Sequence, residues 1–157
     1  GNRLYGCDTC QQVCPYNRGI DFHHHGDMEP EAELVKPKLK PLLKISNREF
    51  KEKFGPLSGS WRGKKPIQRN AIIALGNFKD ETAITEISDI LLHDPRPVLR
   101  GTAAWSLGKI ASKEDSLYRQ EIIQQLEEAK ALENDREVVL EVENALKNAN
   151  HSNTVTS

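Results

Sequence analysis

An internal repeat constrains the fold of this chain more than any other feature. The segment IQRNAIIALG (67–76) recurs as LRGTAAWSLG (99–108), an offset of 32 residues that aligns Ala71 with Ala103 and Gly76 with Gly108. A third and weaker copy begins in NDREVVLEVENALKNA (134–149). Each copy has the apolar spacing of a helix whose hydrophobic face needs a partner, and its small residues allow neighbouring helices to approach closely. Stacked copies would therefore share one continuous core.

The repeat predicts an all-α fold, namely an α-solenoid of about two and a half helix-pair units. We expect helices at 66–76 and 82–92, then at 97–110 and 117–132, with a last helix over 134–149. The pattern resembles HEAT-type repeats, particularly the short variety whose first helix reads AAxxLG. The repeat domain is expected over residues 60–150, and the polar residues 151–157 are expected to form a disordered tail.

Residues 34–59 are predicted to connect the repeats to an irregular arm. Pro37 and Pro41 rule out a regular helix across both positions, because proline lacks the amide donor and clashes with the preceding turn. SNREFKEKFG (46–55) has a capping box at its start, two phenylalanines four residues apart and a glycine stop, so it predicts a short helix. The leucines and isoleucine before it are expected to strap this segment onto the core; they are Leu39, Leu42, Leu43 and Ile45.

The arm, residues 1–33, contains all three cysteines of the chain, Cys7, Cys10 and Cys14, followed by Pro15. This spacing reproduces the last three positions of the ferredoxin run C-x2-C-x2-C-x3-C-P, in which the final cysteine serves a neighbouring cluster. We therefore predict that Cys7 and Cys10 bind one iron–sulfur cluster and that Cys14 binds a second. The remaining thiolates would come from sequence outside this chain.

Two alternatives stay open for these cysteines. A zinc ion accepts three cysteines and one histidine, and the fourth ligand would come from the run His23, His24 and His25. The thiols could also be unliganded. The histidine run itself is interpreted as a solvated stretch of a polar loop.

The formal net charge of −1 conceals a strong segregation of charge. Residues 36–69 hold 11 basic and 2 acidic side chains, whereas residues 110–150 hold 5 basic and 10 acidic ones. SWRGKKPIQRNA (60–71) places four cations at the start of the first repeat helix, which favours binding of an anionic partner such as nucleic acid. Trp61 would then stack on a base. The cations concerned are Arg62, Lys64, Lys65 and Arg69.

A purely structural alternative also explains the basic stretch. The lysines would be a solvated face, and Trp61 would pack against the solenoid. If the nucleic-acid interpretation holds, further cations could extend the surface, because the first helices of successive repeats lie side by side; these are Lys36, Lys38, Lys40, Lys44, Arg96 and Arg100. Trp105 falls within an apolar helical pattern and is expected in the core.

The remaining composition indicates the setting of the protein. No apolar run is long enough for a membrane span, and the start of the chain lacks the pattern of a signal peptide. Clustered cysteines do not resemble a disulfide framework, so a reducing, cytoplasmic location is expected. Because the chain begins Gly-Asn-Arg, we expect it to be a piece of a longer protein.

The motifs YGCDTCQQVCPYN, RNAIIALGN and DPRPVLRGTAAWSLGKI together resemble the C-terminal part of bacterial epoxyqueuosine reductases. The resemblance implies an oxidoreductase that uses two [4Fe-4S] clusters and cobalamin to convert epoxyqueuosine to queuosine at the wobble position of tRNA. Cys7 and Cys10 match ligands of the cluster nearer the cobalamin, and Cys14 matches the last ligand of the other. The tRNA-facing edge is matched by Arg62, Lys65, Arg69 and Asn70.

The resemblance also implies the partner and the limits of this piece. The repeats would bind the tRNA anticodon stem-loop, through Arg62, Lys64, Lys65, Arg69, Asn70 and Arg100. The piece is expected to be a monomer and catalytically inactive by itself, and it need not hold any of the cofactors alone. The alternative function is a HEAT-type protein-interaction scaffold whose arm is stapled by zinc or an iron–sulfur cluster, without redox catalysis.

Overall fold

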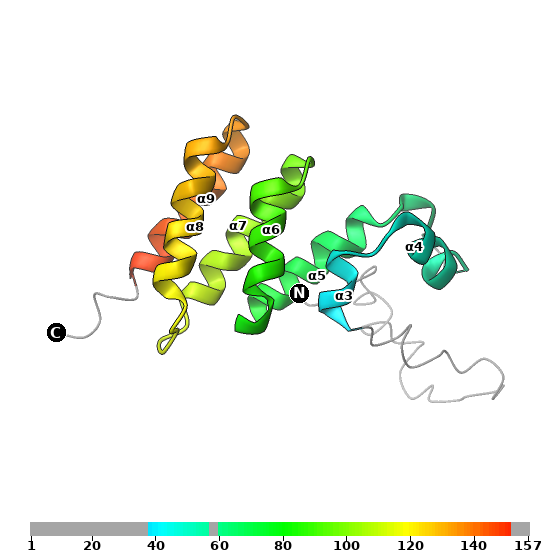
Figure 1. Ribbon diagram of the computed structural model, residues 1–157, viewed down its shortest axis with the longest axis horizontal. Helices are drawn as coiled ribbons and strands as arrows, with labels where there is room; N and C mark the ends of the chain where they lie inside the picture. Colours follow the sequence, from blue (N-terminus) through cyan, green and yellow to red (C-terminus); the bar gives the residue numbers. More distant parts are fainter. Residues whose placement is uncertain (1–37, 57–59, 152–157) are drawn as a thin grey trace, which may run out of the picture.

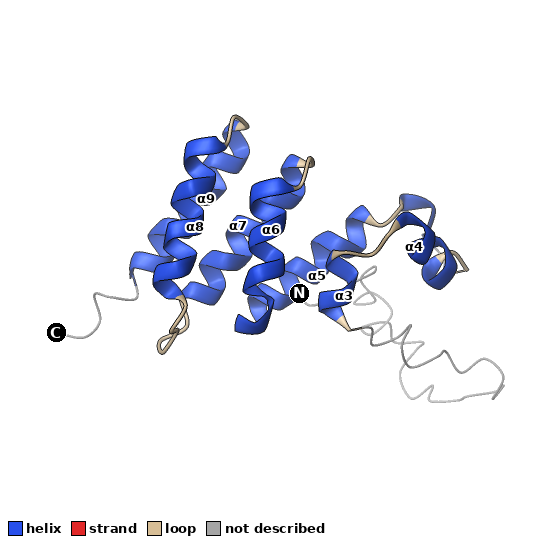
Figure 2. Cartoon of the chain, in the orientation of Figure 1, coloured by secondary structure: helices blue, strands red, loops and turns tan. Residues whose placement is uncertain are grey.

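The computed structural model describes residues 38–56 and 60–151, and every regular element within them is a helix (Figure 1, Figure 2). In chain order the elements are α3 (Leu39–Leu43), α4 (Asn47–Phe54), the 3₁₀ turn η3 (Ser60–Arg62), α5 (Lys65–Asn77), the 3₁₀ turn η4 (Glu81–Ala83), α6 (Ile84–His93), α7 (Pro97–Ala111), α8 (Arg119–Leu132) and α9 (Arg136–His151).

The helices form two layers of a solenoid. The first helices of the units, α5, α7 and α9, pack side by side in one layer, and the second helices, α6 and α8, cover them in the other (Figure 1). α3 packs on α5 and α6 at one end of the stack. The predicted all-α fold built from helix pairs is thus confirmed, and the predicted repeat helices differ from the observed ones by no more than a few residues at their ends.

Local sequence explains where the helices begin. A proline in the first turn starts both α5 and α7, a position where the missing amide costs nothing because that N–H would have no intrahelical partner. At α4 the predicted capping box is present: Ser46 accepts from the amide of Glu49, and Glu49 accepts from the amide of Ser46. Phe50 and Phe54 stack with ring centroids 5.7 Å apart, and both are buried.

Two glycines of the repeat lie where neighbouring first helices touch. A Cβ on Gly76 would lie 2.6 Å from Ser106 Oγ and 2.9 Å from Ser106 Cα, so α5 and α7 can only meet this closely at a glycine. A Cβ on Gly108 would lie 2.8 Å from the Cα of Ala145, which repeats the arrangement between α7 and α9. The buried Ser106 hydroxyl donates to the carbonyl of Ile72 at 3.0 Å, so its polar group is satisfied.

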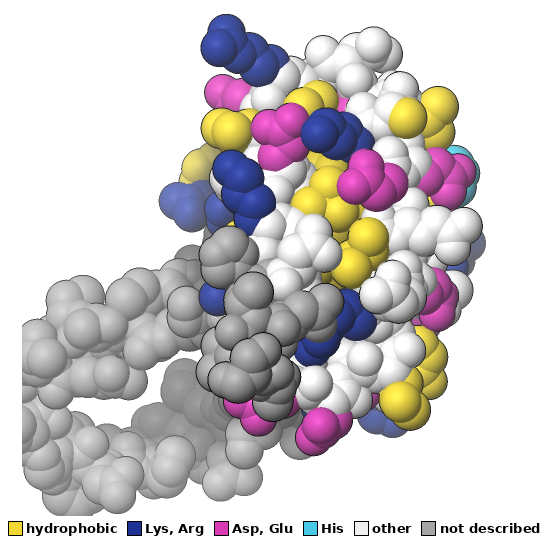
Figure 3. All heavy atoms as spheres, turned by 90° about the vertical axis from the view of Figure 1, so that its left-hand side faces the viewer, with side chains coloured by type: hydrophobic (Ala, Val, Ile, Leu, Met, Phe, Trp, Pro, Cys, Tyr) yellow, Lys and Arg dark blue, Asp and Glu magenta, His cyan; other side chains and the backbone are white. Residues whose placement is uncertain are grey.

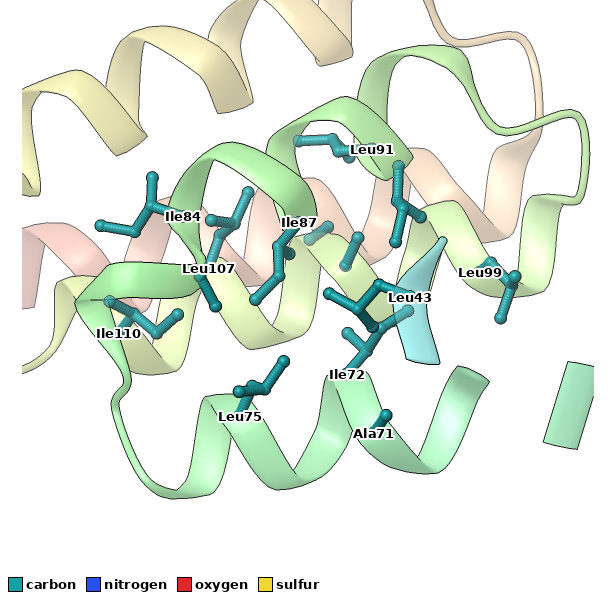
Figure 4. Packing of buried hydrophobic residues seen from close by; sticks show 14 of the residues in the cluster. Leu43, Ala71, Ile72, Leu75, Ile84, Ile87, Leu91, Leu99, Leu107 and Ile110 are labelled. Atoms are coloured by element: carbon teal, nitrogen blue, oxygen red, sulfur yellow. The ribbon is translucent and has the colours of Figure 1, made fainter. Parts of the chain in front are cut away.

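The core runs continuously between the layers. Side chains of α5, α6 and α7 meet in its middle, where Ile72, Ile87 and Leu107 are fully buried (Figure 4). The predicted strap also belongs to this core, because Leu43 reaches into it from α3 and its neighbours Leu42 and Ile45 are buried. Each helix pair therefore completes its hydrophobic face with the next one, as a solenoid requires.

The far end of the solenoid has a different surface. Figure 3 looks onto the side where α8 and α9 lie, and it shows carboxylates and cations mixed around a narrow strip of hydrophobic side chains. Charged side chains of both signs therefore dominate this face (Figure 3). None of the described helices has the length and apolar character of a membrane-spanning helix.

Candidate nucleic-acid interface

The start of α5 has no side-chain cap. Its N-cap residue, Lys64, makes no side-chain capping hydrogen bond, and the first turn contains no acidic residue. The first N–H groups of any helix lack intrahelical partners, and the helix dipole adds partial positive charge there. The helix start therefore favours a phosphate or another anion.

An exposed aromatic side chain stands beside this helix start. Trp61 in η3 is 81% exposed, and the guanidinium carbon of Arg62 lies 5.1 Å from the centroid of its indole ring. Gly63 follows with a φ of +75°, a backbone conformation that glycine adopts without strain, and this turn leads from η3 into α5. The alternative in which Trp61 packs against the solenoid is wrong, because its side chain faces solvent.

Lys65 and Arg69 continue the cationic surface along α5. Both side chains are exposed, and their spacing of four residues places them on one face of the helix. Together with Arg62 they form a cationic stripe, which we define as Arg62, Lys65 and Arg69. Of the six predicted RNA contacts, these three are exposed at the start of the first repeat.

The other predicted contacts are engaged inside the protein. Lys64 is half-buried and donates from Nζ to the carbonyl of Ile45 at 3.0 Å, which ties the strap to α5. Asn70 is half-buried and already takes part in an interaction within the chain. Both assignments stay predictions, and Lys64 in addition has a structural role.

Arg100 forms a two-pronged ion pair with Glu133. Its Nε and Nη2 donate to the two carboxylate oxygens at 2.7 and 2.9 Å, and Nη1 donates to the carbonyl of Asp94 at 2.9 Å. The two side chains are only 16% and 9% exposed. Arg100 therefore joins the loop before α7 to the loop before α9, and its donors are occupied.

A neighbouring network extends this bridge to the first repeat. Arg96 pairs with Asp94 at 2.7 Å and donates from Nη1 to Oε1 of the buried Gln68 at 2.9 Å. Gln68 in turn donates from Nε2 to the carbonyl of Leu43 at 3.0 Å. This polar ladder, defined as Gln68, Arg96, Asp94, Arg100 and Glu133, runs across the ends of successive repeats. The sequence analysis considered Arg96 and Arg100 only as cations of a basic surface, because the sequence gives no sign of this pairing.

The ladder shifts the pKa of its ionisable groups. The Arg100 guanidinium holds the pKa of Glu133 below its usual range, and Glu133 raises the pKa of Arg100 in return. At Asp94, burial opposes ionisation, but the hydrogen bonds from Arg96 outweigh it and lower the pKa. The ion pairs therefore stay charged over the whole neutral range.

The wider basic surface expected from the sequence is thus only partly available. Lys40 donates to the carbonyl of Thr82 at 2.8 Å and lies 3.5 Å from Glu86, and Arg96 and Arg100 belong to the polar ladder. All three side chains already have partners within the chain, and their part in the basic face stays a prediction. Lys44 keeps a mostly exposed side chain, with only a 4.0 Å contact to Asp89.

The predicted metal ligands all belong to residues 1–33. Cys7, Cys10, Cys14 and the histidine run 23–25 lie outside the described residues, as does Lys36. Within residues 38–56 and 60–151, no group of three or more His, Cys, Asp and Glu side chains is arranged to hold a metal ion. The cysteine assignments remain predictions.

Comparison with known proteins identifies the repeat and a set of longer relatives. The HEAT repeats family matches residues 62–147. The chain is 62% identical over 146 residues to epoxyqueuosine reductase of Bacillus subtilis, covering 93% of this chain and 36% of that protein. It is 60% identical to the epoxyqueuosine reductase of Listeria monocytogenes, covering 85% of this chain and 37% of that protein.

A solved structure extends the comparison to three dimensions. A crystal structure of epoxyqueuosine reductase with a tRNA-Tyr epoxyqueuosine-modified tRNA stem loop aligns with a TM-score of 0.82 and 59% identity. The alignment covers 96% of this chain and 38% of that one. The predicted resemblance to epoxyqueuosine reductases is confirmed, and the chain spans little more than a third of the length of these relatives. Since the repeat match covers more than half of its residues, the chain belongs to the HEAT-repeat family.

Proposed function

We propose that this chain is the C-terminal portion of an epoxyqueuosine reductase and that the start of its first repeat binds the tRNA anticodon stem-loop. The observation that carries the proposal is the exposed cationic stripe at the uncapped start of α5, with Trp61 beside it. The 59% identical reductase solved with a tRNA stem loop supports RNA as the anionic partner. The parent enzyme would be a cytoplasmic monomer.

The binding chemistry follows from the side chains. Arg62, Lys65 and Arg69 would contact phosphates, which position the RNA without reading its sequence. Trp61 would stack on an unpaired base of the loop, and Arg62 would add a cation to the face of that ring. The solenoid would hold the stem-loop by its backbone and orient the wobble nucleotide for the remainder of the enzyme.

This chain alone would not supply all the ligands of the parent enzyme's clusters. A cubane cluster requires four thiolates or close substitutes, and the sequence contains only three cysteines. Cys7 and Cys10 would contribute to one cluster and Cys14 to another, with further ligands from the rest of the parent protein. The clusters and the cobalamin would supply electrons and the reducing metal centre, and the described residues would bind and position RNA.

Charge reversal on the stripe tests the proposal. We expect Lys65→Glu/Arg69→Glu to weaken binding of a labelled anticodon stem-loop about tenfold or more at about 50 mM salt, because two phosphate contacts become repulsive. The slope of log affinity against log salt should become shallower by about 1.5, the share of two phosphates. Anisotropy titrations at about 50 and about 200 mM salt measure both quantities.

The matched control reverses two cations elsewhere. Lys130→Glu/Arg136→Glu on α8 and α9 makes the same change of net charge on exposed residues far along the chain. It should affect binding much less than the stripe variant. Trp61→Ala should weaken binding while leaving the salt slope unchanged, since stacking releases no counterions. Equal losses in the two charge-reversal variants would show non-specific attraction and contradict the proposal.

A further inference from the structure

A groove crosses the first helices of all three units. It has a volume of about 590 Å³ and lies against the N-terminal halves of α7 and α9, with α5 at its edge. Its walls carry Ile73 from α5, Val98 and Trp105 from α7, and Leu140 from α9. The volume is in the range of sites that hold a few side chains or a small ligand.

The apolar walls of the groove are open to solvent. Val98 is 47% exposed and Leu140 is 58% exposed, whereas Trp105 is half-buried rather than part of the closed core expected from the sequence. Lys109 lies over the Trp105 ring at 5.6 Å from its centroid. Aliphatic and aromatic side chains that gather in one concave place are typical of a docking surface rather than of scattered surface residues.

A glycine keeps the groove open although packing does not require it. A Cβ on Gly101 would have no neighbour closer than Glu141 Cγ at 3.7 Å, which is ordinary van der Waals contact. This differs from Gly76 and Gly108, where a Cβ would lie under 3 Å from the next helix. A glycine inside a helix costs about 1 kcal/mol relative to alanine. At Gly101 the missing side chain leaves free space in the groove, and no close helix contact requires a glycine there.

The charges around the groove indicate the chemistry of its occupant. Its α9 side carries the carboxylates of Asp135, Glu137 and Glu141, and Arg69 of α5 is the one cation among the described residues that line the groove. The side chains of Glu137 and Glu141 make no hydrogen bond or ion pair with another described residue. In the first turn of α9 the negative charge of Glu137 interacts favourably with the helix dipole. Glu141 lies beyond that turn, so the dipole does not account for its charge. The acidic side is therefore available to a cation.

We infer that this groove docks an amphipathic protein segment with an apolar face flanked by Lys or Arg. The apolar side chains would cover Trp105 and Leu140, and the cations would pair with Glu137 and Glu141, as in helix-in-groove recognition. RNA is disfavoured at this place because three carboxylates would repel its phosphates. The inference is independent of the proposed function, since the stripe and the groove share only Arg69.

The tryptophans of the chain make the groove directly observable. The sequence contains two tryptophans, so Trp61→Phe leaves Trp105 as the only tryptophan, excited selectively over the tyrosines; because Trp61 is 81% exposed, we expect this variant to keep the fold. The probe is a synthetic cationic helix made of leucine and lysine at heptad spacing. We expect a saturable change in Trp105 emission, and no change with the matching leucine–glutamate peptide.

Charge reversal tests whether the cationic peptide binds in the groove. Glu137→Lys/Glu141→Lys should weaken the cationic peptide at least about tenfold, because two attractive pairs become repulsive. Glu127→Lys/Glu128→Lys on α8 makes the same change of net charge at exposed positions outside the groove and should weaken it far less. Anisotropy of a labelled peptide against the unsubstituted chain gives a second readout that does not depend on Trp61→Phe.

Four results would overturn the inference. They are no response of Trp105 to the peptide, equal weakening by the two double variants, a response of Trp105 to the anticodon stem-loop but not to the peptide, and concentration-dependent self-association that Glu137→Lys/Glu141→Lys abolishes. The third would assign the groove to RNA, and the fourth would assign it to a second copy of the chain.

Discussion

The contact between α5 and α7 and the contact between α7 and α9 are the same junction built twice. At each, a glycine meets a small residue of the next first helix: Gly76 faces Ser106, and Gly108 faces Ala145. In both places the distance to a hypothetical Cβ is below 3 Å, so the steric requirement is shared. The glycine therefore recurs in the sequence because the same close contact is made twice.

The polar residues at the two junctions differ. Gln68 and Arg100 occupy equivalent positions at the repeat offset of 32, and both are turned inward. Gln68 is neutral and bridges the Leu43 carbonyl to Arg96, whereas Arg100 is charged and pairs with Glu133. A repeat position thus keeps its geometry while its chemistry changes, provided that the next element supplies a matching partner. Only the second of these positions bridges units by an ion pair.

The largest expected change in stability distinguishes Arg100 from Gln68. Arg100→Met should lower the free energy of unfolding by about 3 kcal/mol, because it leaves the Glu133 carboxylate buried without its cation. Gln68→Met should cost about 1–2 kcal/mol, since it removes the hydrogen bonds to the Leu43 carbonyl and to Arg96 but leaves no charge without its counter-ion, because Arg96 keeps Asp94. Urea unfolding of the two variants beside the unsubstituted chain measures the difference. Equal costs would mean that the ion pair adds nothing beyond its hydrogen bonds.

The next effect concerns the shared glycines. Gly108→Ala should destabilise the fold by about 2 kcal/mol through overpacking against Ala145, whose backbone cannot move aside easily. Gly101→Ala on the same helix is the matched control, and it should be neutral or stabilising by up to about 1 kcal/mol. Thermal unfolding of both variants tests the steric account. A destabilising Gly101→Ala together with a harmless Gly108→Ala would refute it.

The smallest effect is the pH dependence that Glu133 contributes at the second junction. The pKa of Glu133 is lowered in the folded chain from its ordinary value of 4.5, so its ion pair stabilises the fold fully above that value. This stability should be lost as the pH falls from about 5 towards the lowered pKa, because protonation removes the charge that Arg100 pairs with. In Glu133→Gln the acid-side slope of stability should be flatter, as urea midpoints at several pH values would show. An unchanged slope would assign the pH dependence to other carboxylates.

Much of the fold could be predicted because it depends on local spacing. The 3.6-residue period of apolar positions gave the helices, Ser46 with Glu49 gave the start of α4, and the prolines gave the starts of α5 and α7. Repetition of AxxxLG (71–76 and 103–108) then implied stacking, since a motif of small residues is useful only where another helix approaches. These inferences concern residues close together in the chain or the same contact made again.

The candidate interface was predictable only as a charge excess. Counting cations located the basic segment, but it could not separate the exposed Lys65 and Arg69 from Lys64 and Arg100, which are engaged internally. The partners of the engaged cations are distant in sequence: Ile45 lies 19 residues from Lys64, and Glu133 lies 33 from Arg100. Which cation meets which carbonyl or carboxylate depends on the stacking of whole helix pairs.

By itself the sequence determined the helices, their pairing into repeats and the end of the solenoid that carries positive charge, because these follow from composition and short-range periodicity. Only the tertiary structure decided which charges remain exposed, that Trp105 forms the wall of a groove, and that Gly101 leaves space where Gly76 and Gly108 do not. Those features arise where three first helices converge, and the distances between helices are fixed by the packing of the whole core rather than by any one segment.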